Sequence, residues 1–121
     1  TAFNISENLG RLLENQVFIE LIRQGYDTEK TLFYYRSRND KEVDFVTRQG
    51  IKVEKLIQVC YDLTSEKTRR REIDALIEVA SELKCQTLQI ISYQHKEIIE
   101  EKGFTIQVTP FIDWVNEQVL V

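Results

Sequence analysis

The chain has 121 residues, of which 42% are hydrophobic and 10% aromatic, and its formal net charge is −4. This length and apolar content suit one compact domain with a real core and exclude a disordered tail. The acidic balance provides no basic field for a polyanion, which counts against tight nucleic-acid binding by the domain as a whole.

Cysteine and histidine usage limits the chemistry further. Cys60 and Cys85 stand far apart in apolar surroundings, and His95 is the single histidine, so the sequence does not match a zinc site. Without a signal peptide or a long apolar run, these cysteines predict a reducing compartment, and we expect a cytoplasmic protein with no membrane contact. The chain starts with Thr1 and runs at once into an amphipathic segment, so we expect it to be part of a longer protein.

The first half of the chain predicts one helix and three strands. An apolar stripe at helical spacing predicts a helix over about residues 7–24, ended by Gly25. The stripe consists of Leu9, Leu12, Leu13, Val17 and Leu21, widened by Phe18 and Ile22. The aromatic segment "TLFYYRSR" and the segment "EVDFVT", separated by the turn "RNDK", predict a β-hairpin. After another turn, "IKVEKLIQVCYDL" changes from alternation to a continuous apolar run, which is typical of a strand that enters the centre of a sheet.

The second half predicts a helix over about residues 66–84, capped by Thr64 or Ser65. "CQTLQIISY" then reads as a buried strand, and "HKEIIEEKG" as a short helical turn or connection closed by Gly103. "FTIQVT" alternates as a strand does, and "PFIDWVNEQVL" predicts a last helix that starts at Pro110. The predicted order is α-β-β-β-α-β-β-α, in the α/β class.

Asp44 lies inside an apolar strand, where a carboxylate costs energy unless it is paired or bound to a cation. Strand alternation predicts one face with Glu42, Asp44 and Val46, while Val43 and Phe45 share the other. On the next strand Gln58 and Cys60 are neighbours on one face. Asp44 is either a ligand of a metal site or a carboxylate near a strand end that accepts a hydrogen bond from the helix over 66–84.

Four segments, in order, carry a resemblance: "GRLLENQVFIEL", "KEVDFV", "LIQVCYDL" and "TRRREIDAL". Together they resemble the C-terminal domain of unknown function of prokaryotic AAA+-type ATPases, within the PD-(D/E)XK nuclease-like superfamily. The resemblance runs from about Leu9 through Ser92. It implies a restriction-endonuclease-like αβββαβ core with a central mixed sheet flanked by helices. Residues 1–121 would then form a single nuclease-like domain, the C-terminal fragment of a longer ATPase.

The resemblance also assigns site residues. In active members the third strand carries Glu-X-Lys, whose glutamate joins an aspartate to hold Mg²⁺ and whose lysine orients the attacking water. The corresponding positions here are Glu14 and Asp44 for the other acidic ligands, Gln58 for the glutamate and Cys60 for the lysine. Gln58 lacks a charge worth about 4 kcal/mol of gross Coulomb energy at 4 Å, so Mg²⁺ or Mn²⁺ is expected to bind weakly. Cys60 supplies no fixed positive charge.

Two points about this site stay open. Glu14 either faces inward, near Val17, or is a solvated boundary carboxylate. A site that has migrated to Glu54 and Lys55 is disfavoured, because adjacent strand residues face opposite sides of the sheet. Lys52 and Glu54 share the face of Gln58 but lie two to three strand steps from it, so they could take part only in a different register.

The run "TRRRE" contains Arg69, Arg70 and Arg71. Arginine forks suit phosphate, so these residues are the candidate nucleic-acid contacts. The alternative is a solvated helix face, on which Arg71 and Glu72 make salt bridges that organise the sheet edge or reach Asp44.

Three functions follow from the resemblance. The first is a catalytically degenerate module for interaction or regulation, partnered by the N-terminal ATPase region of the same chain, with DNA or another protein as a further partner. The second is a Mg²⁺- or Mn²⁺-dependent DNA endonuclease that uses Glu14 and Asp44, with Gln58 assisting. The third is a purely structural cap of the ATPase. The chain has no GxxxxGK[ST] loop, so we do not expect these residues to bind ATP.

Overall fold

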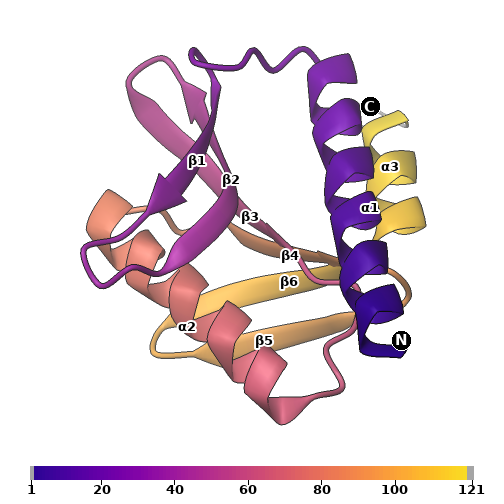
Figure 1. The fold of residues 1–121 in the computed structure, drawn as a ribbon. Helices are drawn as coiled ribbons and strands as arrows, with labels where there is room; N and C mark the ends of the chain where they lie inside the picture. Colours follow the sequence, from indigo (N-terminus) through magenta and orange to yellow (C-terminus); the bar gives the residue numbers. More distant parts are fainter. Residues whose placement is uncertain (1, 120–121) are drawn as a thin grey trace.

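The computed structural model describes residues 2–119, which form one six-stranded sheet with helices on both faces (Figure 1). The helices are α1 (Ala2–Arg23), α2 (Glu66–Leu83) and α3 (Phe111–Val119). The strands are β1 (Leu32–Arg36), β2 (Glu42–Gln49), β3 (Lys52–Val59), β4 (Leu88–Ser92), β5 (Glu97–Glu101) and β6 (Phe104–Pro110).

The sheet is mixed, with strand order β1-β2-β3-β4-β6-β5. The first three strands form an antiparallel meander, α2 then carries the chain across to β4, and β3, β4 and β6 run parallel. The prediction that the third strand is central is confirmed, since β3 lies between β2 and β4 and buries Leu56 and Ile57 completely.

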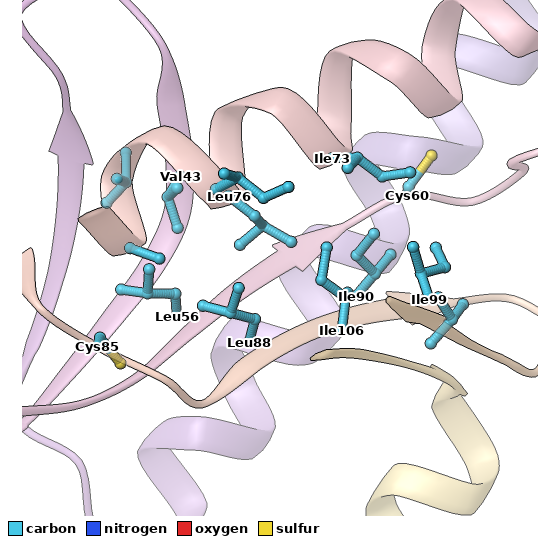
Figure 2. Packing of buried hydrophobic residues seen from close by; sticks show 14 of the residues in the cluster. Val43, Leu56, Cys60, Ile73, Leu76, Cys85, Leu88, Ile90, Ile99 and Ile106 are labelled. Atoms are coloured by element: carbon cyan, nitrogen blue, oxygen red, sulfur yellow. The ribbon is translucent and has the colours of Figure 1, made fainter. Parts of the chain in front are cut away.

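Each face of the sheet has its own hydrophobic cluster. Under α2, the buried side chains of Ile73 and Leu76 pack over Val43, Leu56 and Ile90, as Figure 2 shows. The opposite face is covered by α1 and α3, which lie side by side in Figure 1. The buried side chains of the second hydrophobic cluster, on this face, are Val17 and Leu21 from α1, Trp114 from α3, and Leu32, Phe45, Ile57 and Ile91 from the sheet. The α/β class and the helices that flank the sheet are therefore as predicted.

Both long helices agree with their periodicity. Leu13, Val17 and Leu21 face the core from α1, which begins at Ala2, more than a turn before the predicted start. The predicted stripe is too wide, because Leu12, Phe18 and Ile22 are exposed. In α2 the N-cap is Ser65, whose side chain accepts the N–H of Thr68. Within residues 2–119, no helix has both the length and the apolar character that crossing a bilayer requires.

One predicted element is wrong. The segment expected to be a helical turn or connection contains β5, an edge strand that pairs antiparallel with β6. The two strands are joined by Lys102 and Gly103, both with positive φ (51° and 81°), which suits a tight two-residue hairpin turn. Ile99 faces the core while Ile98 is exposed, so the strand alternates. At the end of β6, Pro110 precedes α3, which begins at Phe111.

Candidate functional site

A β-bulge in β2 shapes the candidate site. β1 pairs Phe33 with Val46 and Tyr35 with Val43, so β2 has one more residue than β1 over this interval. Val43 and Val46 therefore both pack in the cluster under α2, while Phe45 packs in the cluster under α1. The expectation that Val43 and Phe45 share a face is wrong, because the bulge interrupts the two-residue alternation.

Gln58 closes the bulged end of β2 with its side chain, which is only 2% exposed. Its Oε1 accepts the backbone N–H of Asp44 at 2.9 Å, and its Nε2 donates to the carbonyl oxygen of Glu42 at 3.0 Å. The backbone pairing of β2 with β3 ends at Phe45 and Ile57. Beyond this pair, the side-chain amide of Gln58 makes the hydrogen bonds to the backbone of β2. An amide can do this because it carries both a donor and an acceptor, whereas a carboxylate only accepts.

Asp44 holds the other side of the same junction. Its Oδ2 accepts the backbone N–H of Val59 at 2.8 Å, so the donor comes from β3 and not from the helix that follows. Burial raises the pKa of Asp44 to about 7, with further contributions from Glu14, Glu72 and Glu42, while the Val59 N–H acts in the opposite direction. At neutral pH this carboxyl group is therefore divided between its neutral and charged forms.

Three of the four residues assigned to the site line one pocket, and Cys60 is not among its lining residues. A pocket of about 380 Å³ opens between α1, α2 and the ends of β2 and β3, with Glu14, Asp44 and Gln58 all in its wall. Glu14 is half-buried, and burial followed by the charge of Glu42 raises its pKa. The other lining residues are Gly10, Asp40, Lys41, Glu42, Val59, Arg71, Glu72 and Ala75.

Glu72 is the acidic neighbour that the sequence reasoning missed as a site residue. Its pKa is raised by burial and by Glu14, and Arg71, with Nη2 at 3.3 Å, acts against this rise. A signal was present, because Glu72 continues the helical stripe of Ala75 and Val79, both of which are buried. The first turns of α2 therefore bring a further carboxylate to the pocket, which Glu14, Asp40, Glu42 and Asp44 also line.

This ligand set does not fit a Mg²⁺ centre as arranged. Magnesium favours oxygen ligands in a strict octahedral geometry, with carboxylates as its usual protein ligands. The Oε1 of Gln58 already accepts a backbone N–H, and one oxygen of Asp44 does too. Among residues 2–119, no three His, Cys, Asp or Glu side chains come together in a way that could hold a metal ion.

At the lysine position, Cys60 supplies no charge. Its side chain is buried, its Sγ donates to the carbonyl oxygen of Asp62 at 3.3 Å, and burial raises its pKa to about 12. The thiol is therefore neutral at physiological pH. The cations in the pocket wall come instead from Lys41 and from Arg71, which is paired with Glu72.

The three arginines of α2 all contact carboxylates. Arg69 makes a bidentate pair with Glu97 of β5, at 2.8 and 2.6 Å. Arg70 reaches Glu101 of the same strand at 2.7 Å. The sheet edge is thus contacted by Arg69 and Arg70, whereas Arg71, which the salt-bridge alternative named with Glu72, contacts Glu72 within α2 at 3.3 Å. A phosphate would have to compete with these carboxylates.

Glu54 and Lys55 belong to a different cluster. Tyr26 donates to Glu54 at 2.6 Å, Thr47 donates to it at 3.0 Å, and the ammonium of Lys55 lies 5.6 Å from the centre of the Tyr26 ring. Neither residue lines the pocket that contains Asp44.

Comparisons with known proteins give a family and a fold. The family model described as a domain of unknown function (DUF4143) matches residues 9–112. The uncharacterized protein MJ1544 of Methanocaldococcus jannaschii is 39% identical over 119 residues, which cover 93% of this chain and 26% of the relative. The chain thus spans about a quarter of that relative's length.

A solved structure has a similar fold. It is a chain from the refined half-complex of the tetradecameric assembly of Thermococcus gammatolerans McrB AAA+ hexamers with bound McrC. The two chains superpose with a TM-score of 0.52 at 15% identity, over 82% of this chain and 27% of the other.

Proposed function

Because the chain belongs to the family described as a domain of unknown function (DUF4143), we propose that it is the C-terminal module of a longer, cytoplasmic AAA+-type ATPase. In this proposal the module has a restriction-endonuclease-like fold of the PD-(D/E)XK type, no longer cleaves DNA, and acts in interaction or regulation. Its first partner is the N-terminal ATPase region of the same polypeptide. The similarity in fold to a chain from an assembly of AAA+ hexamers supports this proposal.

The bonding of Gln58 carries the proposal. An active site of this type needs a carboxylate at that position with oxygens free for the metal. Here an amide stands there, and its two polar atoms bond Asp44 N–H and the carbonyl oxygen of Glu42. The position therefore serves the strand junction, and the adjacent Cys60 holds a neutral thiol where the reaction needs a cation.

A Mg²⁺- or Mn²⁺-dependent DNA endonuclease is the second candidate. The observation that favours it is that Glu14, Asp44 and Glu72 line one pocket. There the charges of Glu14 and Glu72 raise the pKa of Asp44, and the charge of Glu14 raises the pKa of Glu72. A cation entering the pocket would relieve this repulsion. The acidic net charge and the pairing of the arginines with carboxylates act against DNA binding.

A nicking assay separates the two candidates. The full-length protein is incubated with supercoiled plasmid and either Mg²⁺ or Mn²⁺, beside the variants Asp44→Asn and Asp113→Asn. Asp44→Asn keeps an acceptor for the Val59 N–H, and Asp113, exposed on α3, provides the matched control. We expect no nicking by any of the three. Nicking that Asp44→Asn abolishes and Asp113→Asn preserves would establish the endonuclease.

The ATPase rate of the same variants tests the regulatory role. We expect Asp44→Asn to change the rate of the full-length protein several-fold, while Asp113→Asn leaves it at the parent value. If both variants match the parent in ATPase rate and in binding to the ATPase region, the module is the structural cap instead.

A further inference from the structure

Helix α1 is apolar on two faces. The inner face consists of Leu13, Val17 and Leu21, all buried against the sheet. On the outer face, Ile5, Leu12 and Ile19 are 61%, 59% and 49% exposed. A surface helix normally presents polar side chains to water opposite its buried stripe, and a helix that is apolar all round is normally covered on both sides. The outer face of α1 therefore has the composition of a contact surface.

The spacing of the outer residues indicates the shape of the partner. Ile5, Leu12 and Ile19 recur at heptad spacing, and Ile22 extends the row one turn further, at the spacing of a d position after an a position. Aliphatic residues in such a row form the seam along which a second helix packs. The other d positions are occupied by the polar Asn8 and Asn15, so the apolar row is continuous only along the a positions Ile5, Leu12 and Ile19.

A groove continues this row toward α3. It has a volume of about 170 Å³ and lies between the two helices, where Ile19 meets Phe111 and Val115. Gln16, Glu20 and Arg23 line the groove as well. Grooves that accept an amphipathic helix combine apolar contacts with polar side chains of this kind.

We propose that the outer face of α1, with the α1–α3 groove, is the docking surface for a helix of the ATPase region of the same polypeptide. This inference rests on the proposed function, which supplies that region. It is supported by length: this chain spans only 26% of its archaeal relative, so about three quarters of such a polypeptide lies outside the fold described here. An intramolecular partner at high effective concentration also keeps this face covered without a second molecule.

Hydroxyl-radical footprinting of the full-length protein tests the docking surface. If the surface is covered, Leu12 and Ile19 should be oxidised several-fold more slowly than their exposure in this domain predicts. Two exposed isoleucines elsewhere in the domain provide the reference rate of oxidation. Those references are Ile51, in the β2–β3 turn and 99% exposed, and Ile98, on β5. Oxidation of Leu12 and Ile19 in proportion to their exposure would overturn the proposal.

A pair of matched variants completes the test. In the full-length protein, Leu12→Glu with Ile19→Glu should release the contact and raise the oxidation of Ile22 several-fold, and Ile51→Glu with Ile98→Glu should not. Sedimentation velocity over a range of concentrations identifies the occupant. Protection that is constant in the monomer supports the docked ATPase region, and protection that grows with self-association overturns it in favour of a second copy. A parent polypeptide with no nucleotide-binding loop would instead refute the proposed function itself.

Discussion

The backbone N–H of Val59 donates to Oδ2 of Asp44 at 2.8 Å. The acid that the nuclease resemblance assigns to a metal site thus holds β3 against the bulged end of β2. Gln58 makes the reciprocal bond by accepting the N–H of Asp44, so the two side chains together replace the backbone ladder where it stops. Both side chains therefore hold the strand junction together, and the contribution of each to stability can be measured.

Gln58→Glu should destabilise the protein, although it restores the residue type of an active nuclease. The carboxylate would lose the donor to the carbonyl oxygen of Glu42 and face that oxygen in a buried site. We expect a loss of about 1–3 kcal/mol in the free energy of unfolding, measured with urea at pH 8. Gln107→Glu, on an exposed position of β6, should stay within about 0.5 kcal/mol of the parent.

Calorimetry with Mn²⁺ extends this measurement to the double variant Gln58→Glu with Cys60→Lys. If the site has degenerated through these two changes, Mn²⁺ should bind the double variant and recover part of its lost stability, while the parent shows no binding heat. Mn²⁺ binding by the parent at equal affinity would contradict the degenerate interpretation.

The pKa of Asp44 predicts a pH effect of known sign. The folded protein raises this pKa from 3.8 to about 7, so between these values it binds more protons than the unfolded chain. The contribution of Asp44 to stability is therefore full below about pH 4 and falls as the pH rises to 7, by up to a few kcal/mol, since one pKa unit corresponds to about 1.4 kcal/mol. Asp44→Asn, which removes the charge and keeps an acceptor, should be more stable than the parent at pH 8.

The difference in unfolding free energy between Asp44→Asn and the parent, measured from pH 4 to 8, is the observable. Other carboxyl groups titrate in both proteins and cancel in this difference. A variant that is less stable than the parent at pH 8 would show that the charged form of Asp44 has a stabilising cation partner that the structure does not contain.

Glu97 should behave in the opposite sense. Its hydrogen bonds from Arg69 and then from His95 lower its pKa from 4.5 to about 2. The ionised pair therefore stabilises the protein above pH 4.5, and this stabilisation is lost as the pH falls toward 2. Glu97→Gln should lower the free energy of unfolding by about 1 kcal/mol at pH 7. This is the upper end of the range for a partly exposed ion pair, and we expect it because the contact with Arg69 is bidentate. Glu100→Gln, exposed on the same strand, is the control, and an equal cost for both would refute a specific pair.

Two glycine substitutions should have opposite signs. Gly103 has φ of 81° in the β5–β6 turn, and Gly103→Ala should destabilise the protein by about 1–2 kcal/mol. Gly10 lies inside α1 with open space at its Cβ position, so Gly10→Ala should stabilise it by up to about 1 kcal/mol. Thermal unfolding measures both. A stabilising Gly103→Ala would contradict the positive φ on which the hairpin depends.

The sequence by itself determined the elements whose patterns are local. The inward stripe of α1, the cap of α2 and the central place of β3 follow from the spacing of apolar residues along single segments. It also placed Gln58 on β3, whereas Cys60 lies directly after Val59, the last residue of that strand. The resemblance then assigned Glu14, Asp44 and Gln58 to one site, and they do line one pocket.

Tertiary structure decided the rest. The segment over 97–101 is a strand because β6 pairs with it. The one local feature that indicates a hairpin is the turn at Lys102 and Gly103. The bulge in β2 depends on the register with β1, and Glu72 reaches the pocket because α2 crosses over the sheet. Hydrogen bonds between strands and the packing of a helix on a sheet join residues distant in sequence. The roles of Asp44 and Gln58 at the strand junction could therefore be recognised only in the folded chain.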